Sequence, residues 1–210
     1  TILKDMDAQT RQRLHALHVM PVCSSTMDAC PIPHGAGITV CVAESQTHGR
    51  GQHQQAWSSP PQCGIWASLC YRATQHAPHS ALPLHIALAL IRAISAFDNA
   101  PALQIKWPND LYAHKHKFAG TLVESQSHGR TFIIKIGFGL TLYPHPDGPH
   151  HPHCAPLSSF WPHMPDRHSL FLSILKHLFA TLDQSEPALP EMLGPLDMLK
   201  GRNVTVVSGT

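Results

Sequence analysis

The stretch Leu103-Gln-Ile-Lys-Trp-Pro-Asn-Asp110 contains the signals that decide the fold. Its first five residues predict a short strand, and Pro108 ends that strand because proline forces the chain out of a sheet. Asn109 and Asp110 follow at the strand's end, which is where the ligand sites of α/β proteins tend to lie. The stretch therefore predicts a sheet that carries polar groups at the end of one strand.

Lys106 is the unusual residue of this short strand. A lysine among apolar residues is costly to bury unless it meets an anion or reaches water. Two interpretations stay open at this point. Either the lysine faces a bound anion, or the strand lies at a sheet edge, with the lysine in solvent and an Asx turn after it.

Further elements are predicted on both sides of this stretch. Apolar runs rich in β-branched residues predict strands over residues 38–43, 65–71, 117–124 and 131–142. Apolar residues at helical spacing predict helices over 80–97 and 166–182, and a short polar helix is expected over 7–18. Residues 144–165 are dense in Pro and His and predict an irregular loop, while 201–208 predict a last strand. Strands interleaved with helices indicate a mixed α/β domain.

Composition excludes several classes of protein. The 210 residues are 43% hydrophobic and 13% charged, with a formal net charge of +2, so neither disorder nor a dedicated nucleic-acid binder is expected. No apolar run approaches the roughly 20 residues that span a bilayer, so no membrane association is expected. The six cysteines contain no Cys-x-x-Cys pair and predict reduced, mostly buried thiols in a cytoplasmic protein.

Two short glycine-containing elements are candidates for ligand binding. In Gly49-Arg50-Gly51, the glycines let the backbone approach a ligand, and Arg50 can neutralise a carboxylate or a phosphate. In Lys117-Phe-Ala-Gly120, a lysine enters a strand through small residues, which suits a cation held against a ligand. Taken alone, the first element also fits a plain surface turn, and the second an ordinary strand start.

The elements occur together in one order. They are Ser25-Thr26, Ala43 to Gly51 with Trp57-Ser-Ser-Pro60, Lys106-Trp-Pro-Asn-Asp110, Lys117-Phe-Ala-Gly120 with Leu122-Val-Glu124, and Ile136-Gly-Phe-Gly139. This order resembles the biotin protein ligase family over residues 15–143. In addition, Gly201-Arg-Asn-Val-Thr-Val206 is similar to the first strand of that family's small C-terminal SH3-like barrel.

The resemblance implies a fold and a domain division. We expect an α/β (α+β) catalytic domain over residues 1–185, with a mixed sheet backed by helices. This is the biotinyl/lipoyl transferase fold, akin to class II aminoacyl-tRNA synthetases. Residues 186–210 would form a linker and the first strand of a truncated SH3-like barrel. About twenty residues precede Ser24, so no N-terminal helix-turn-helix domain is expected in this chain.

The resemblance also implies an activity. The family joins biotin to ATP, giving biotinyl-5′-adenylate and pyrophosphate, and then passes biotin to a lysine of a biotin carboxyl carrier protein. Mg²⁺ would arrive bound to ATP rather than in a metal site of the protein's own. The implied partner is the carrier domain, with no nucleic acid or membrane, and the implied oligomeric state is a monomer or weak homodimer.

Residue roles follow from the same resemblance. Lys117, which would contact both the biotin carboxylate and the α-phosphate, and Arg50 are the expected catalytic residues. The expected biotin contacts are Ser25, Thr26, Gln46, Arg50, Gly51, Gln52, Ser68, Lys117 and Gly120. The expected ATP contacts are Arg50, Gln52, Trp57, Lys106, Asn109, Asp110, Lys117 and Thr141.

The chain departs from the family's pattern at several positions. After Gly51 the usual loop continues as Arg-x-Gly-Arg-x-Trp, whereas this chain has Gln52-His-Gln-Gln-Ala-Trp57, so the adenylate would be held less tightly. Met27 and Thr141 stand where asparagines are expected, and most of the barrel is missing. A catalytically weakened biotin-binding module and a lipoate ligase are therefore the alternatives. The four histidines within residues 145–153 lack defined zinc-site spacing, and we assign them no metal.

Overall fold

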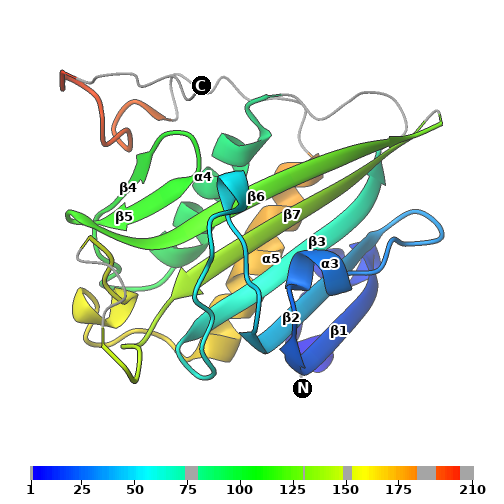
Figure 1. Ribbon diagram of the computed structural model, residues 1–210, viewed down its shortest axis with the longest axis horizontal. Helices are drawn as coiled ribbons and strands as arrows, with labels where there is room; N and C mark the ends of the chain where they lie inside the picture. Colours follow the sequence, from blue (N-terminus) through cyan, green and yellow to red (C-terminus); the bar gives the residue numbers. More distant parts are fainter. Residues whose placement is uncertain (1, 74–79, 130, 149–152, 184–192, 204–210) are drawn as a thin grey trace.

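A seven-stranded mixed sheet forms the centre of the molecule (Figure 1). The computed structural model describes residues 2–73, 80–129, 131–148, 153–183 and 193–203. The strand order is β1-β2-β3-β7-β6-β5-β4. The first pair is parallel and all other neighbouring pairs are antiparallel. The strands are β1 (Leu14–Cys23), β2 (Ile38–Gln46), β3 (Gly64–Ala73), β4 (Leu103–Lys106), β5 (Asp110–Ala113), β6 (His116–His128) and β7 (Thr131–Thr141).

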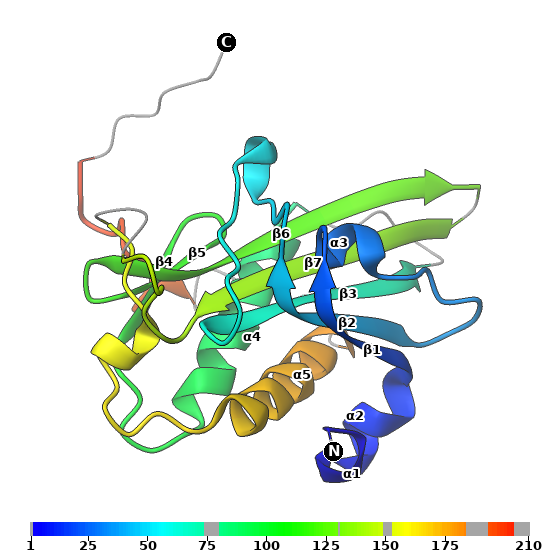
Figure 2. The same cartoon turned by 60° about the horizontal axis from the view of Figure 1, so that its bottom comes forward.

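Two long helices cover one face of this sheet (Figure 2). They are α4 (Leu82–Ser95), which is buried along most of its length, and α5 (Arg167–Asp183). The shorter elements are α1 (Ile2–Asp5), α2 (Ala8–Arg13), α3 (Thr26–Ala29) and the 3-10 turns η1 (Gln52–Gln54) and η2 (Leu157–Ser159). None of the helices in the described ranges is long and apolar enough to cross a membrane.

The opposite face of the sheet carries α3 and the loop between β2 and β3, which crosses in front of β6 and β7 in Figure 1. Successive side chains of a strand point to opposite faces. Ile136 and Phe138 of β7 therefore pack into the core beneath the helices. Gly137 and Gly139 alternate with them and face the loop side. Because they lack a Cβ, the side chains of Met27 and Trp57 can pack directly against the sheet.

The expected polar helix over residues 7–18 is only partly present. α2 is capped by Asp7, whose carboxylate accepts a hydrogen bond from Thr10 N at 3.0 Å, but the helix ends at Arg13. The chain then enters β1, which pairs in parallel with β2 from Leu14 to Cys23. Pro21 is tolerated because β1 is an edge strand. Pairing along a strand has overridden a weak local helical pattern.

The predicted bounds of one strand need correction. The expected strand over residues 103–107 ends at Lys106, and a second short strand, β5, begins at Asp110 and pairs back on β4. Asp110 therefore starts a strand rather than trailing one. The expected strand over 201–208 falls mostly outside the described residues. Residues 194–201 form turns, and this segment pairs with β4, where Ile105 N donates to Leu196 O at 2.8 Å.

Ile136 provides a test of the core. It is fully buried at the centre of β7, so Ile136→Ala is expected to lower the free energy of unfolding by about 2–5 kcal/mol. Urea denaturation followed by circular dichroism measures the change. Val19→Ala, on an edge-strand side chain that is 64% exposed, is the matched control and is expected to change it by less than about 0.5 kcal/mol. Equal losses would contradict this placement of the core.

Candidate functional site

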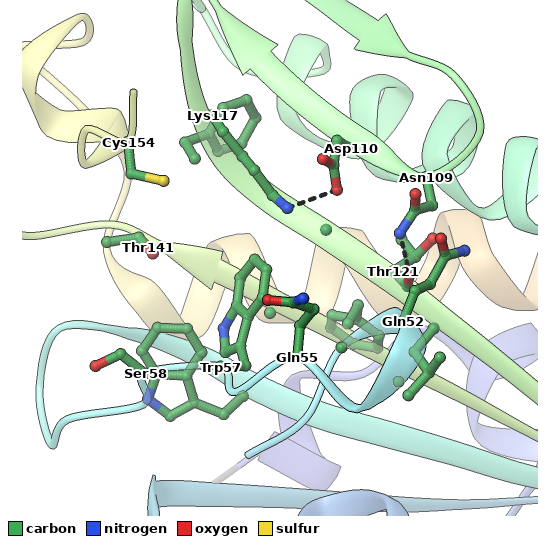
Figure 3. Close-up of a pocket in the computed structure, with 18 of the residues that line it drawn as sticks. Gln52, Gln55, Trp57, Ser58, Asn109, Asp110, Lys117, Thr121, Thr141 and Cys154 are labelled. Atoms are coloured by element: carbon green, nitrogen blue, oxygen red, sulfur yellow. Dashed lines mark hydrogen bonds and ion pairs between the residues drawn. The ribbon is translucent and has the colours of Figure 1, made fainter. Parts of the chain in front are cut away.

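A cavity of about 930 Å³ lies on the loop side of the sheet. Its floor comes from β6 and β7, and its walls come from α3, from the loop between β2 and β3, and from residues 153–156 and 198–202. Figure 3 shows polar and aromatic side chains of the loop between β2 and β3, of β6 and of β7 around one space. Mixed polar and apolar walls of this size suit an organic ligand that carries charged groups.

Lys117 lines the cavity, and its side chain points toward Asp110 (Figure 3). Its Nζ lies 2.7 Å from Asp110 Oδ1 and 5.0 Å from the centroid of the Trp57 ring. Both charged side chains keep only about a quarter of their surface exposed, at 24% and 22%. A positive charge in such a recess can offset the negative charge of a ligand and stabilise charge that develops during a reaction.

The backbone on both sides of Lys117 is fixed by a segment from the histidine-rich region. Lys117 N donates to His153 O at 2.9 Å, and Ala155 N donates to Lys117 O at 3.1 Å. This pairing brings Cys154 to the cavity wall, where Figure 3 shows it near Lys117. The predicted irregular loop therefore contributes to the site through its backbone. Among the described residues, no group of His, Cys, Asp or Glu is arranged to hold a metal ion.

Trp57 lies flat against two glycines of the floor. A Cβ built on Gly139 would stand 2.6 Å from Trp57 Nε1, and one built on Gly120 would stand 3.1 Å from Trp57 Cζ3. Any larger side chain at these positions would push the indole away. The Nε1 donor of Trp57 is buried and makes no hydrogen bond within the described part of the chain. In this conformation the indole N–H is therefore a buried donor without an acceptor.

A polar network occupies the end of the cavity near α3. Gln46 Oε1 accepts hydrogen bonds from Thr26 N at 2.7 Å and Thr26 Oγ1 at 3.1 Å, and Gln46 Nε2 donates to Ser59 Oγ at 2.7 Å. These contacts fix the orientation of the amide group. The network offers both donors and acceptors to a ligand, as recognition of a urea-like group requires.

Ser68 does not line the cavity, although we expected it among the biotin contacts. It is fully buried on β3, and its hydroxyl lies 2.7 Å from Thr26 Oγ1. It therefore supports Thr26 from behind. The remaining expected residues all line the cavity: Ser25, Thr26, Gln46, Arg50, Gly51, Gln52, Trp57, Lys106, Asn109, Asp110, Lys117, Gly120 and Thr141.

Two of these residues differ from their expected surroundings. Asn109 Nδ2 donates to Thr121 O at 2.8 Å, so the NH₂ group of the Asn109 amide is engaged by the backbone of β6 (Figure 3). Arg50 donates to Asp28 Oδ2 at 2.6 Å and lies 3.2 Å from Glu124 Oε2, so its charge is compensated by two carboxylates of the protein. Both residues are partly committed to internal contacts.

Sequence reasoning missed several residues of the cavity wall: Gln55, Tyr112, Thr121, Cys154, Met198 and Arg202. Tyr112 is buried, and burial, followed by the nearby Asp110 carboxylate, raises the pKa of its hydroxyl. The hydroxyl therefore stays protonated and can donate. Met198 and Arg202 lie in no recognisable sequence motif, and they reach the cavity because residues 196–198 pair with β4.

Known proteins share both sequence and fold with this chain. The bifunctional ligase/repressor BirA of Escherichia coli is 35% identical over 104 residues, which cover 49% of this chain and 32% of that protein. The biotin–[acetyl-CoA-carboxylase] ligase of Mycobacterium tuberculosis is 29% identical over 181 residues, which cover 83% and 65%. The chain spans about a third of the length of the first curated relatives that it matches.

A solved structure confirms the expected fold. Biotin protein ligase from Leishmania major, in complex with biotinyl-5-AMP, superposes with a TM-score of 0.74 at 23% sequence identity. The match covers 93% of this chain and 87% of that one. The mixed sheet backed by helices is therefore the fold of that ligase.

A sequence profile extends the likeness to a family. The profile of the biotin/lipoate A/B protein ligase family matches residues 19–140, which is more than half of the chain. This range contains most of the expected site residues, including Lys117, Asp110 and Arg50. The chain therefore belongs to the biotin/lipoate A/B protein ligase family.

Proposed function

We propose that this protein activates biotin with ATP, releasing pyrophosphate, and then transfers biotin from biotinyl-5′-adenylate to a lysine of a biotin carboxyl carrier protein. The observation that carries the proposal is the placement of Lys117 beside Asp110, between a polar network and an aromatic wall, in one cavity. The names of the curated relatives support biotin as the acid. The carboxylase named for the Mycobacterium tuberculosis ligase supports a carboxylase carrier as the acceptor.

The first step needs a cation because two anions must meet. The biotin carboxylate attacks the α-phosphate of ATP, an acyl phosphate bond forms, and the bond to pyrophosphate breaks. Lys117 would offset the repulsion between the reactants and stabilise the charge that develops on the α-phosphate oxygens. Asp110, at 2.7 Å, would hold the Lys117 side chain in position until the substrates arrive.

The polar network would bind the ureido ring of biotin. A ureido group has two N–H donors and one carbonyl acceptor, so its site must supply both kinds of partner. Thr26 and Gln46 offer a hydroxyl and an amide held in fixed orientation, and Ser25 lies beside them, buried at the same end of the cavity. The acid chain of biotin would then run along the floor toward Lys117.

The aromatic end of the cavity would bind the nucleotide. Trp57 would contact the adenine, and Lys106 and Asn109 would lie on the phosphate side. Asp110 is the one carboxylate among the described residues that line the cavity, which fits Mg²⁺ held mainly by ATP phosphates and water. When bound with ATP, Mg²⁺ would neutralise phosphate charge.

The second step is attack by a lysine amine on the mixed anhydride. The amine nitrogen bonds to the biotinyl carbonyl carbon and loses a proton, and AMP leaves with the bonding electrons. The open mouth of the cavity would admit an extended lysine side chain from a carrier. The six free cysteines fit a reducing compartment, so we place the reaction in the cytoplasm.

A transfer assay tests this proposal. The protein is incubated with ATP, Mg²⁺, biotin and a purified carrier domain, and mass spectrometry of the carrier is expected to show one added biotinyl group. A carrier whose acceptor lysine is replaced by arginine is the control and should stay unmodified. Excess lipoate is expected to leave the yield unchanged. Modification by lipoate instead would identify a lipoate ligase, and biotin binding without turnover would identify a binding module.

A further inference from the structure

Arg50 forms ion pairs with two carboxylates from elements that are distant in sequence. Arg50 Nη1 donates to Asp28 Oδ2 at 2.6 Å, Nη2 lies 3.2 and 3.3 Å from the two oxygens of Glu124, and Nε lies 3.4 Å from one of them. Asp28 belongs to α3, Glu124 belongs to β6, and Arg50 lies in the loop between β2 and β3. We call Arg50, Asp28 and Glu124 the Arg50 latch.

The three elements joined by the latch frame the cavity. α3 contributes Thr26 and Met27, the loop contributes Gly51 and Gln52, and β6 contributes Gly120. α3 is also tied to the sheet by Lys135 of β7, whose Nζ donates to Met27 O at 2.6 Å. The latch therefore fastens the loop to a helix that the sheet already holds.

The loop itself has few other charges with which to make this connection. Between Thr47 and Trp57, Arg50 is the one lysine or arginine in the sequence. The backbone hydrogen bonds at the tip of the loop are local, such as Gly51 N to Gln55 O at 2.7 Å and Trp57 N to Gly49 O at 2.8 Å. Fastening the tip to α3 and β6 by charge thus depends on Arg50.

The charges and exposure of the Arg50 latch suit ion pairs that can break and form again. The hydrogen bond to Asp28, followed by Glu124, raises the pKa of Arg50, so the guanidinium stays charged. Asp28 and Glu124 keep 58% and 45% of their side-chain surface exposed, and ion pairs with such exposure are weak. Ion pairs of this strength can break and form again without unfolding the elements they join.

We propose that Asp28 and Glu124 are positioning residues: through Arg50 they hold the loop closed over the cavity and set the lifetime of the bound biotinyl-adenylate. This inference rests on the proposed function, because it takes the adenylate as the ligand. Arg50 contributes mainly by closing the loop, since its charge is already compensated by two carboxylates. Retention of the intermediate then depends on residues that do not touch the reacting atoms.

The test measures how fast chemically synthesised biotinyl-5′-adenylate dissociates from the full chain. The complex is mixed with excess biotin as the competitor, and the protein's tryptophan fluorescence is followed by stopped flow. Asp28→Asn and Glu124→Gln are each expected to raise the dissociation rate by about three- to tenfold. Asp28→Glu, which keeps the charge, is expected to restore most of the retention. Asp183→Asn removes a similarly exposed carboxylate that pairs with Arg13 on the far side of the sheet, and it should leave the rate unchanged.

Coupling to Arg50 separates this role from a general structural one. In an Arg50→Gln background, Asp28→Asn and Glu124→Gln are expected to have no further effect, because the latch is already broken. Added salt should raise the dissociation rate of the wild type more than that of the double variant Asp28→Asn with Glu124→Gln, in which only the charges of the ligand itself remain to be screened. Wild-type dissociation rates in the single variants, or full additivity with Arg50→Gln, would overturn the inference. Absence of adenylate binding by the wild type would instead overturn the proposed function, and the inference with it.

Discussion

Replacing Lys117 by alanine is expected to lower the rate of biotin-dependent pyrophosphate release by about a hundred- to a thousandfold. The ammonium group lines the cavity 2.7 Å from the Asp110 carboxylate, and Lys117→Ala leaves that carboxylate facing the incoming phosphates. The reaction would lose a stabilising charge and gain a repulsive one. A coupled pyrophosphate assay at saturating biotin and ATP measures the effect.

The fold should survive this substitution, because the Lys117 side chain is partly exposed and its backbone partners remain. Lys117→Arg, which keeps the charge at a different reach, is expected to retain more activity than Lys117→Ala. Lys176→Ala is the matched control, since this exposed lysine lies on α5, across the sheet from the cavity. Activity of Lys117→Ala within threefold of wild type would remove Lys117 from the reaction.

Gly139→Ala is expected to raise the KM for ATP by about tenfold. The added Cβ would stand 2.6 Å from Trp57 Nε1 and 2.8 Å from Trp57 Cε2, so the indole must leave its position on the floor. A displaced Trp57 could no longer form the aromatic wall that we assign to adenine. Initial rates over a range of ATP concentrations give the KM, and calorimetry gives the affinity for biotin alone.

The change should be larger for ATP than for biotin, since the substitution displaces the Trp57 indole, whereas the Trp57 backbone joins the network around Gln46 through Ser59. Gly35→Ala is the control, because a Cβ at Gly35 meets nothing within 4 Å. A KM for ATP that stays at the wild-type value in Gly139→Ala would contradict the assignment of Trp57 to the nucleotide. An equal loss of biotin affinity would show that the substitution acts on the whole cavity.

The main strands and the two long helices could be predicted from the sequence because their apolar periodicity is strong. α4 and α5 differ from the expected helices by one or two residues at each end. β1 was missed because the residues after Arg13 owe their conformation to pairing with β2, more than twenty positions along the chain. β5 was missed because it is a four-residue strand that depends on its two neighbours.

The candidate site was largely predictable because its residues occur in short, ordered motifs. Lys117, Asp110 and Trp57 come from three such motifs, and the structure brings them within contact. The partners of Arg50 could not be read from the sequence, because Asp28 and Glu124 lie 22 and 74 positions away. Cys154 could not be predicted either, since it belongs to no motif and lies at the cavity only because its backbone pairs with Lys117.

The most direct test of the proposed activity is the formation of biotinyl-adenylate by the purified protein. The protein is incubated with Mg²⁺, biotin and ATP labelled at the α-phosphate, and the products are separated by thin-layer chromatography. Labelled biotinyl-5′-adenylate that requires biotin, accompanied by an equal amount of pyrophosphate, is the predicted result. Binding of biotin in calorimetry with no labelled adenylate at any ATP concentration would contradict the account.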